Sequence, residues 1–417
     1  MDAHSAPKGG LPQYDPVHNL ITSQPQPHPH PHRRSRIRRS RAAKLIALGS
    51  IVFVAYSQWV QLRTQQSGAG LLSLDKLQAD FKTCEKLQHK PKDPSGPREK
   101  NARYIGGHKP TLIRNATIWT GEPVQGTSAA EAKSGKGYGW INSDILLQYG
   151  LILSVEPSIS KDNLPADTVI WEAEGRQLTA GVIDMHSHAG VYPLPSLNGG
   201  NDGNEMSNDI TPFVRSIDGL DPFDPQYQVI KSGGVTTSLI LPGSGNNMGG
   251  EAYLVKHAIG KKDGRKEIGP KDMLADPEGT WRYMKMACGE NAKGVYGGAG
   301  VDNGPFSRLG ESWYFRHAFE QAKQQVVAQD DWCNAAAANG VESMKTYLPQ
   351  ELKWESLGAA LRGQVHINTH CYTIADLEAF VDHTNEFEFP VRAFHHAHQT
   401  YLVPEVMLLY LKPINRS

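Results

Sequence analysis

The sequence predicts an α/β protein in which a small β-domain precedes a domain of alternating strands and helices. Between residues 109 and 178, short stretches alternate apolar and polar residues and end near glycines, which is typical of half-buried strands. From residue 179 to 417, apolar strands alternate with helical segments. This alternation favours a mainly parallel sheet, either closed or doubly wound.

The strands and helices follow from local patterns. In the β-domain, TLIRNATIWTG, DILLQYGLILSVEP and DTVIWEAEGRQL each have the period of two that a strand shows. Beyond it, apolar runs with polar ends predict strands, and longer segments with helical periodicity predict the helices between them. The predicted strands are 178–188, 234–243, 284–291, 364–371 and 390–398, and the predicted helices are 225–234, 311–340 and 373–387.

Composition excludes several classes of protein. Lysine and arginine together number 43, as do aspartate and glutamate, so nothing indicates a nucleic-acid partner. Four cysteines in 417 residues are too few for a disulfide-stapled scaffold, and they lack the paired spacing of a structural zinc site. No repeat of roughly 20–50 residues is visible, which argues against solenoids and propellers. Neither the oligomeric state nor cysteine pairing follows from the sequence.

The N-terminal region predicts a membrane anchor. Residues 1–41 are rich in Pro, His and Arg and are expected to form a disordered basic tail. Residues 42–62 contain an apolar run that spans about 27 Å as a helix, close to the thickness of a bilayer core. Arginines precede this run, so the positive-inside rule predicts a single-pass membrane protein with a cytoplasmic N-terminus and a lumenal or extracellular body. A cleaved signal peptide and a soluble apolar helix are the alternatives.

Residues 63–108 are polar and rich in Lys and Pro, and are predicted to form a stalk or linker between this anchor and the body. The Asn115-Ala116-Thr117 triplet is a glycosylation sequon, which is compatible with a lumenal or extracellular body.

Histidines follow three of the predicted strands. His186 and His188 are two residues apart at the end of one strand, so they point to the same face. His370 ends a later strand, and the run of His395, His396 and His398 ends another. Imidazoles from several strands that meet at carboxyl ends are what a metal centre at the mouth of a β/α barrel requires.

The succession RNATIWTGE, DILLQYGLI and GRQLTAGVIDMHSHAG resembles the opening of the amidohydrolase superfamily of metal-dependent hydrolases, in particular its imidazolonepropionase-like and prolidase-like members. The resemblance covers roughly Thr111 to Val406. It implies a TIM-type (β/α) barrel with an N-terminal β-sandwich segment. It also implies one or two divalent metal ions, with Zn²⁺ expected, and a small-molecule substrate.

The resemblance also assigns metal ligands by position. His186 and His188 match the first-strand pair, His370 the fifth-strand histidine and His396 the sixth-strand histidine, with His395 and His398 as alternatives. The family's bridging ligand is a carboxylated lysine or a glutamate. Glu290, at the end of a predicted strand, is our candidate for it.

A glycine-rich segment, residues 242–252, follows the second strand of the larger domain and is expected to form an active-site loop. Its backbone amides can hold an anionic or carbonyl group, and its pattern is not that of a dinucleotide-binding loop. We expect Gly245, Asn246 and Glu251 from this segment, together with His398, to contact the substrate.

These residues predict hydrolysis of a non-peptide carbon–nitrogen bond, in a cyclic amide or an N-acyl compound, by metal-activated water. The family's catalytic aspartate on the eighth strand has no counterpart in the sequence, so the catalytic residue stays unassigned and the barrel is expected to be incomplete. Two alternatives stay open. One is a prolidase-like dipeptidase, and the other is a catalytically impaired, membrane-anchored homologue that binds metal.

Overall fold

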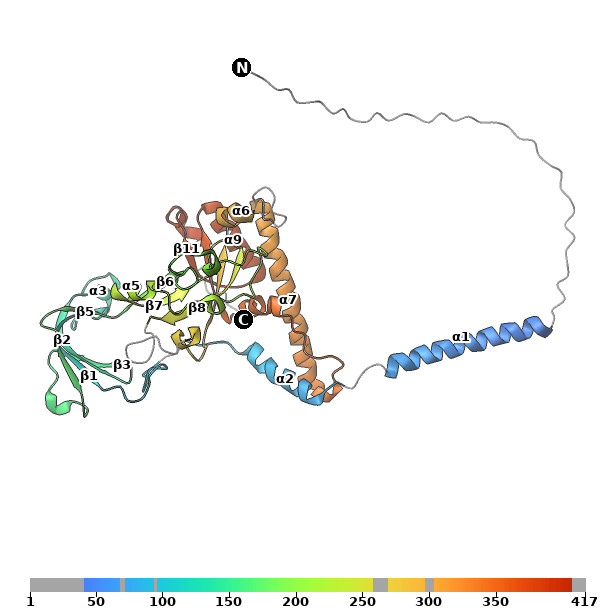
Figure 1. The fold of residues 1–417 in the computed structure, drawn as a ribbon, viewed down its shortest axis with the longest axis horizontal. Coiled ribbons are helices and arrows are strands. Elements are labelled where there is room, and N and C mark those ends of the chain that lie inside the picture. The colour runs from blue at the N-terminus through green and yellow to red at the C-terminus, as the bar shows by residue number, and fades with distance from the viewer. Residues whose placement is uncertain (1–40, 68–71, 94–95, 258–268, 297–303, 407–417) are drawn as a thin grey trace, which may run out of the picture. The chain divides into compact units, whose positions relative to one another are not determined.

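The computed structural model describes residues 41–67, 72–93, 96–257, 269–296 and 304–406 (Figure 1). The chain divides into two compact units, residues 1–71 and residues 72–417. Apart from Arg41, the predicted basic tail, residues 1–41, lies outside the described residues.

The first unit contains one described helix, α1 (Arg41–Ser67), which includes the segment predicted to cross a membrane. Ser50 and Ser57 lie within it and donate hydrogen bonds to the carbonyl oxygens of Ile46 and Val54, each at 2.9 Å. These hydroxyls, with Gln58, interrupt the apolar run. Across the described ranges, no helix is both long enough and apolar enough to span a bilayer, so the predicted transmembrane helix at residues 42–62 is not supported.

The smaller sheet lies in the second unit and corresponds to the predicted β-domain. Its strand order is β3-β2-β1-β4, and β5 also pairs with β1. Adjacent β1, β2 and β3 are antiparallel, whereas β4 and β5 run parallel to β1. The bounds are β1 (Thr111–Trp119), β2 (Ile141–Gln148), β3 (Leu151–Glu156), β4 (Val169–Glu172) and β5 (Gln177–Thr179), with the short helix α3 (Ala129–Lys133) between β1 and β2. Ala116 and Ile118 of β1 are buried together with Ile145, as the period of two predicts, whereas Leu112 precedes a shift of register between Ile113 and Ala116 and is buried with Leu146 in a separate cluster.

The larger sheet has six strands in the order β11-β10-β9-β8-β7-β6. The pairs β6–β7, β9–β10 and β10–β11 are parallel, as the sequence pattern predicts. The bounds are β6 (Val182–Ser187), β7 (Val235–Ile240), β8 (Met248–Lys256), β9 (Arg282–Ala287), β10 (Val365–Cys371) and β11 (Val391–His396). The described strands form an open path with β6 and β11 at its ends, and do not close a barrel by strand pairing.

Strand β8 corrects the predicted topology. The segment expected to be an active-site loop, residues 242–252, enters this strand at Met248. β8 runs antiparallel to both β7 and β9. The short connection from Ile240 to Met248 explains the direction, because a parallel crossover needs a dozen or more residues. Gly250 has φ +112°, and a Cβ there would lie 2.5 Å from the Val214 carbonyl oxygen, so glycine is required for this close approach.

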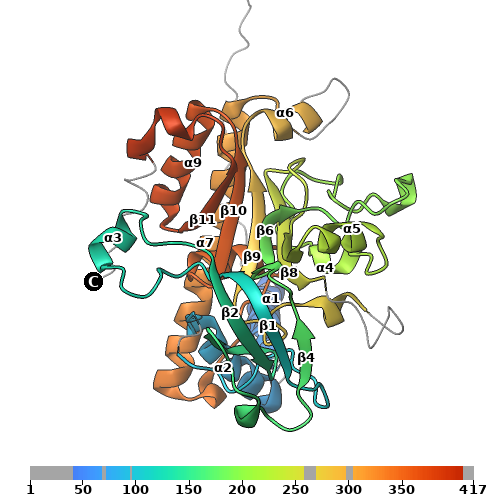
Figure 2. The same cartoon turned by 90° about the vertical axis from the view of Figure 1, so that its left-hand side faces the viewer.

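Helices cover the sheet at both ends. Figure 2 shows α9 (Ile374–Phe387) beside β10 and β11. At the other end, α4 (Ser216–Gly219) contacts β8 and α5 (Gln226–Ser232) contacts β7. The long helix α7 (Arg308–Asn339) packs on α8 (Leu352–Leu361) and α9. The main core, between α7, α8, α9 and β9, β10, includes Phe315, Phe319 and Phe380. Burial of each such ring contributes about 1.5–3 kcal/mol.

The predicted stalk, residues 63–108, contains a packed helix, α2 (Leu74–Gln88). Its Cys84 forms a disulfide with Cys333 of α7, and Leu77 is buried in the same cluster. Asp80 is also buried and accepts a hydrogen bond from the Leu348 backbone amide at 3.2 Å. These contacts join α2 to the body, so residues 74–88 do not form a free linker.

Candidate metal centre

Histidines from three strands of the larger sheet meet at the carboxyl ends of those strands. His186 lies in β6, His370 in β10, and His395 and His396 end β11. The register of β10 and β11 places His370 opposite His395. β6 lies at the other end of the sheet path, yet the His186 ring centroid is 4.7 Å from those of His395 and His396. The sheet is therefore curled so that its two end strands approach each other there.

His188 follows β6 and presents one unprotonated nitrogen to His186. Its Nδ1 lies 2.8 Å from the Leu241 carbonyl oxygen, which can only accept, so Nδ1 carries the hydrogen and Nε2 carries the lone pair. That Nε2 lies 3.2 Å from Nε2 of His186. Two nitrogens bound tetrahedrally to one zinc ion lie about 3.3 Å apart, given zinc–nitrogen bonds of about 2.0–2.1 Å. The two Nε2 atoms are thus spaced as two ligands of one ion.

His395 presents a second lone pair to His186. Asn368 donates from its Nδ2 to the His366 carbonyl at 3.1 Å, which fixes its amide and leaves Oδ1 as an acceptor. That Oδ1 lies 3.0 Å from His395 Nε2, so His395 carries its hydrogen there and its Nδ1 is a bare acceptor. The two Nδ1 atoms of His186 and His395 are 2.8 Å apart.

A neutral His186 cannot donate a hydrogen bond to both His188 and His395. Burial, reinforced by the charge of Lys285, lowers the pKa of His186 to about 2, so its ring is neutral near pH 7. A neutral imidazole has one N–H and can donate to either His188 or His395. The other contact then joins two lone pairs across 2.8–3.2 Å, which is repulsive unless a cation lies between them. This proton count is the strongest sign of a metal-binding arrangement.

The buried ring of His370 also indicates a cation-binding arrangement. It is 1% exposed, and within the described ranges neither of its ring nitrogens has a hydrogen-bond partner. Burial, together with the neighbouring His396, lowers the pKa of His370 to about 3. The ring is therefore neutral near pH 7, and its second nitrogen keeps an unpaired lone pair instead of a proton. Buried polar atoms without partners are costly and rare. A bound cation would use the lone pair of this ring.

The structure also places His396, assigned as the sixth-strand ligand, and its two alternatives, His395 and His398, at or just after the end of β11. His396 has φ +63°, and the turn of the backbone there brings both His395 and His396 against His186. The His396 ring is also 4.7 Å from His370. His398 is exposed, and its ring lies 5.2 Å from that of Tyr372.

Lys285 of β9 is a residue that our sequence reasoning missed. Its side chain is fully buried, and Nζ lies 3.1 Å from both the Pro242 carbonyl oxygen and the Ser244 hydroxyl. Burial lowers the pKa of Lys285 to about 7. Its charge depresses the pKa of all five histidines of the cluster, which places the ammonium beside them. A lysine inside the apolar run MKMAC was the signal that could have identified it.

Glu290, the predicted bridging ligand, lies elsewhere. The strand ends at Ala287, and Glu290 is the first residue of α6 (Glu290–Tyr296). Its side chain is exposed and interacts electrostatically with Arg308. On β9 it is Lys285, not Glu290, that faces the histidines.

Gly245 and Asn246, predicted to contact substrate, are engaged in the protein's own structure. The Gly245 amide donates to Asn204 Oδ1 at 2.9 Å. Asn246 is fully buried, and its Nδ2 lies 2.6–2.9 Å from the carbonyl oxygens of Glu205 and Asn208 and from the Tyr296 hydroxyl, within reach of its two hydrogens. Both residues therefore hold the segment that follows β6.

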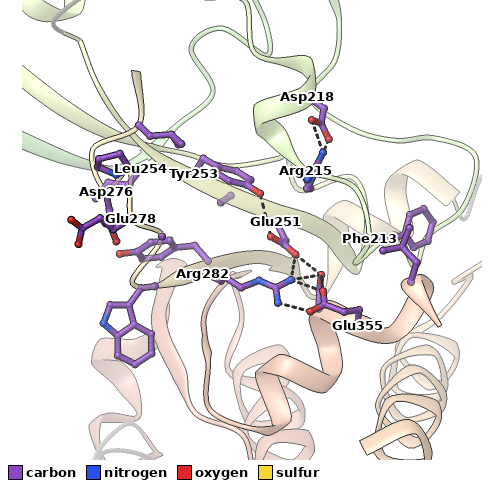
Figure 3. A pocket seen from close by; sticks show the side chains of 18 residues that line it. Phe213, Arg215, Asp218, Glu251, Tyr253, Leu254, Asp276, Glu278, Arg282 and Glu355 are labelled. Carbon is purple, nitrogen blue, oxygen red and sulfur yellow. Dashed lines mark hydrogen bonds and ion pairs between the residues drawn. The ribbon is translucent and has the colours of Figure 1, made fainter. Parts of the chain in front are cut away.

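Glu251, the third predicted substrate contact of this segment, faces a separate pocket (Figure 3). It accepts hydrogen bonds from Arg282 and from the Ser356 hydroxyl. Glu251 therefore lies apart from the histidine cluster. The prediction that it contacts the substrate was made because the strand that carries it, β8, was expected to be a loop.

Comparisons with known proteins identify the family. No family model matches the chain. The chain is 58% identical over 407 residues to a protein named amidohydrolase tasK from Hapsidospora irregularis, an alignment that covers 96% of this chain and 41% of that protein. The fold matches the crystal structure of an amidohydrolase from Thermotoga maritima MSB8 with a TM-score of 0.56 and 26% identity, over 71% of this chain and 67% of that one. The chain belongs to the amidohydrolase superfamily.

The chain spans about two fifths of the length of its Hapsidospora relative. Within its described residues, no group of three or more His, Cys, Asp or Glu side chains is arranged to hold a metal ion. The histidine nitrogens meet in pairs, at His186–His188 and His186–His395, not around one common point. The donor set nevertheless fits a divalent cation, since the one lone pair of a neutral His186 faces a lone pair of either His188 or His395, and among the described residues both nitrogens of His370 lack hydrogen-bond partners.

Proposed function

We propose that this chain carries the metal-binding part of a hydrolase that cleaves non-peptide carbon–nitrogen bonds in cyclic amides or N-acyl compounds. The names of its relatives support amide hydrolysis as the reaction class. The observation that carries the proposal is the contact of His186 with two other histidines whose facing nitrogens both hold lone pairs. Such a site stabilises a cation and has little other use.

The ligands we assign are His186, His188, His370 and a histidine of β11, for one or two divalent ions, with zinc expected. His395 and His396 both reach the cluster, and His395 has the better defined lone pair. For the bridging position we propose Lys285 in place of Glu290. A buried amine with a pKa near neutrality is the form that reacts with carbon dioxide to give the carboxylated lysine expected in this family.

Neighbouring residues orient these side chains. Leu241 holds the His188 ring through Nδ1, and Asn368 holds the His395 ring through Nε2. Such contacts fix the tautomer and the direction of the free nitrogen. When bound, a divalent cation would supply Lewis acidity, lowering the pKa of a water molecule and polarising the carbonyl of the substrate. Asp184, which accepts a hydrogen bond from the His186 amide at 3.0 Å, helps to fix the backbone at that ligand.

The test combines metal analysis with an activity assay. The full chain, loaded with Zn²⁺ and desalted, would be analysed for zinc and assayed against N-acyl amino acids, cyclic amides and dipeptides that end in proline. Stoichiometric zinc with hydrolysis of the first two classes supports the proposal, and preferential cleavage of the dipeptides favours the prolidase-like alternative. Zinc without turnover of any substrate supports an impaired metal-binding homologue. Absence of bound zinc would contradict both the amide hydrolase and the prolidase-like dipeptidase hypotheses.

We also propose that the body lies in an oxidising compartment, lumenal or extracellular. Disulfides join Cys84 to Cys333 and Cys288 to Cys371, and such bonds persist mainly outside the cytosol. Asn115, the acceptor residue of the sequon, is exposed, as glycosylation requires. A mobility shift of the protein on endoglycosidase treatment, absent in Asn115→Gln, tests this. Lack of a shift together with free thiols in the native protein would contradict it.

A further inference from the structure

A pocket with a volume of about 640 Å³ lies away from the histidine cluster. β8, β9 and α8 contribute to its wall, as do the segments before α4 and before β9 (Figure 3). Neither Lys285 nor any histidine of the cluster lines this pocket. A ligand here would not occupy the proposed hydrolytic site.

The wall of this pocket carries an excess of negative charge. Its lining contains five carboxylates, Asp218, Glu251, Asp276, Glu278 and Glu355, and two guanidinium groups, Arg215 and Arg282. Both arginines are neutralised inside the wall. Arg282 donates to Glu355 at 2.7 Å and also to Glu251, and Arg215 donates to Asp218 at 2.7 Å.

Two carboxylates remain without a cationic partner among the described residues. Asp276 accepts a hydrogen bond from the Thr280 amide at 2.6 Å, and Glu278 is exposed. Figure 3 shows both at the same end of the pocket. Asp276 also raises the pKa of Tyr283, after burial of that phenol, which places its carboxylate close to the ring.

Aromatic rings line the same pocket beside these carboxylates. Tyr253, Trp281 and Tyr283 belong to its wall, and each is half-buried. Trp281 is held rigidly, because it stacks on His366 with ring centroids 3.9 Å apart and donates from Nε1 to Asp93 at 2.9 Å. Aromatic faces attract cations, and a rigid ring loses little entropy when a ligand binds. The rings and the carboxylates are independent features that select the same kind of ligand.

We propose that this pocket binds an organic ammonium ion that carries an apolar or aromatic body. The ammonium group lies near Asp276 and Glu278, and the apolar body packs against Tyr253, Trp281 and Tyr283. An anionic ligand is disfavoured, because neither arginine is free to receive it. The volume suits a small molecule, since ligand pockets are typically about 300–1,000 Å³.

The experiment uses calorimetric titration of the full chain with three matched probes: phenethylamine, the neutral 2-phenylethanol and the anionic 3-phenylpropionate. We expect saturable binding of phenethylamine at least about tenfold tighter than that of the alcohol, and no binding of the acid. The intrinsic tryptophan fluorescence, to which Trp281 contributes as one of eight tryptophans, should change with the same saturation curve, and this change should be absent in Trp281→Phe. Equal affinity for amine and alcohol, or no saturable amine binding, would overturn the proposal.

Variants locate the binding. Glu278→Gln alters an exposed side chain, and Asp276→Asn keeps an acceptor for the Thr280 amide, so the double variant with both substitutions should fold normally. This double variant should bind phenethylamine about tenfold more weakly, or weaker still. Glu378→Gln, an exposed carboxylate on α9, is the matched control and should bind as the unmodified chain does. Unchanged affinity in the double variant would contradict the assignment to this pocket. Zinc content should be equal in all of these proteins, which separates this outcome from failure of the proposed hydrolytic site.

Discussion

The Nδ1 atoms of His186 and His395 lie 2.8 Å apart, although 209 positions separate the two residues in the chain. This contact joins the first and last strands of the larger sheet at their carboxyl ends. It exists because the sheet curls, and it places two imidazoles where one proton cannot satisfy both neighbours of His186. The metal-binding interpretation follows from that geometry.

The first prediction concerns His186. Substitution by alanine removes the ring that contacts both His188 and His395, and we expect zinc affinity to fall at least about a hundredfold, in keeping with loss of a ligand. Equilibrium competition with a chromogenic chelator measures the change. His317→Ala, an exposed histidine stacked on Trp313 of α7, is the control and should bind zinc normally. Equal loss in both variants would point to unfolding.

A second prediction separates Lys285 from Glu290. Lys285→Met keeps the length of a fully buried side chain and removes its amine, so it should lower bound zinc and abolish any hydrolysis while the fold is retained. Glu290→Gln, on the exposed first turn of α6, should leave both unchanged. Zinc analysis and far-ultraviolet circular dichroism on both variants check this. The reverse pattern would restore Glu290 as the bridging ligand.

A third prediction concerns pH and Glu311. This carboxyl is buried on α7, accepts hydrogen bonds from the Gly289 amide and from Asn247, and burial raises its pKa to about 7. Because the pKa of Glu311 in the folded state lies above the unfolded value of 4.5, its contribution to the free energy of unfolding is fully present below pH 4.5 and is lost as the pH rises to about 7. Across that interval, the free energy of unfolding of the unmodified chain should therefore fall by a few kcal/mol relative to that of Glu311→Gln. Urea unfolding of both proteins at several pH values measures the difference, and a constant difference would contradict the account.

The fourth prediction concerns the disulfide between Cys84 and Cys333, which closes a chain segment of 249 residues. Replacing both cysteines by alanine should lower the free energy of unfolding by about 3–5 kcal/mol, mainly because the unfolded chain regains freedom. The midpoint of urea unfolding should fall, while zinc binding stays the same because α2 contributes no proposed ligand. A loss of zinc binding in the folded variant would show that α2 also supports the metal centre.

The sequence predicted the position of a histidine where the histidine stands at the end of a recognisable strand. His186, His188 and His370 stand at the ends of apolar strands, and the carboxyl ends of such strands meet in an α/β sheet, so their convergence was predictable. Which histidine at the end of β11 joins them was not predictable, because a positive φ at His396 allows two neighbouring histidines to face the same cluster.

Three features escaped the sequence analysis for physical reasons. β8 begins with two glycines after its first methionine, so it has the composition of a loop, and its pairing on both sides overrides that local preference. α2 has a polar surface, and its attachment depends on Cys84 meeting a residue 249 positions away. Lys285 was overlooked because a lysine inside a strand is usually assigned to an edge or surface.

The most direct test of the metal centre is the zinc X-ray absorption spectrum of the metal-loaded full chain, compared with that of His186→Ala. The account predicts a first shell of nitrogen and oxygen ligands at about 2.0–2.1 Å, with multiple-scattering features of at least two imidazoles that weaken in the variant. A spectrum of hydrated zinc, or identical imidazole scattering in the two proteins, would contradict it.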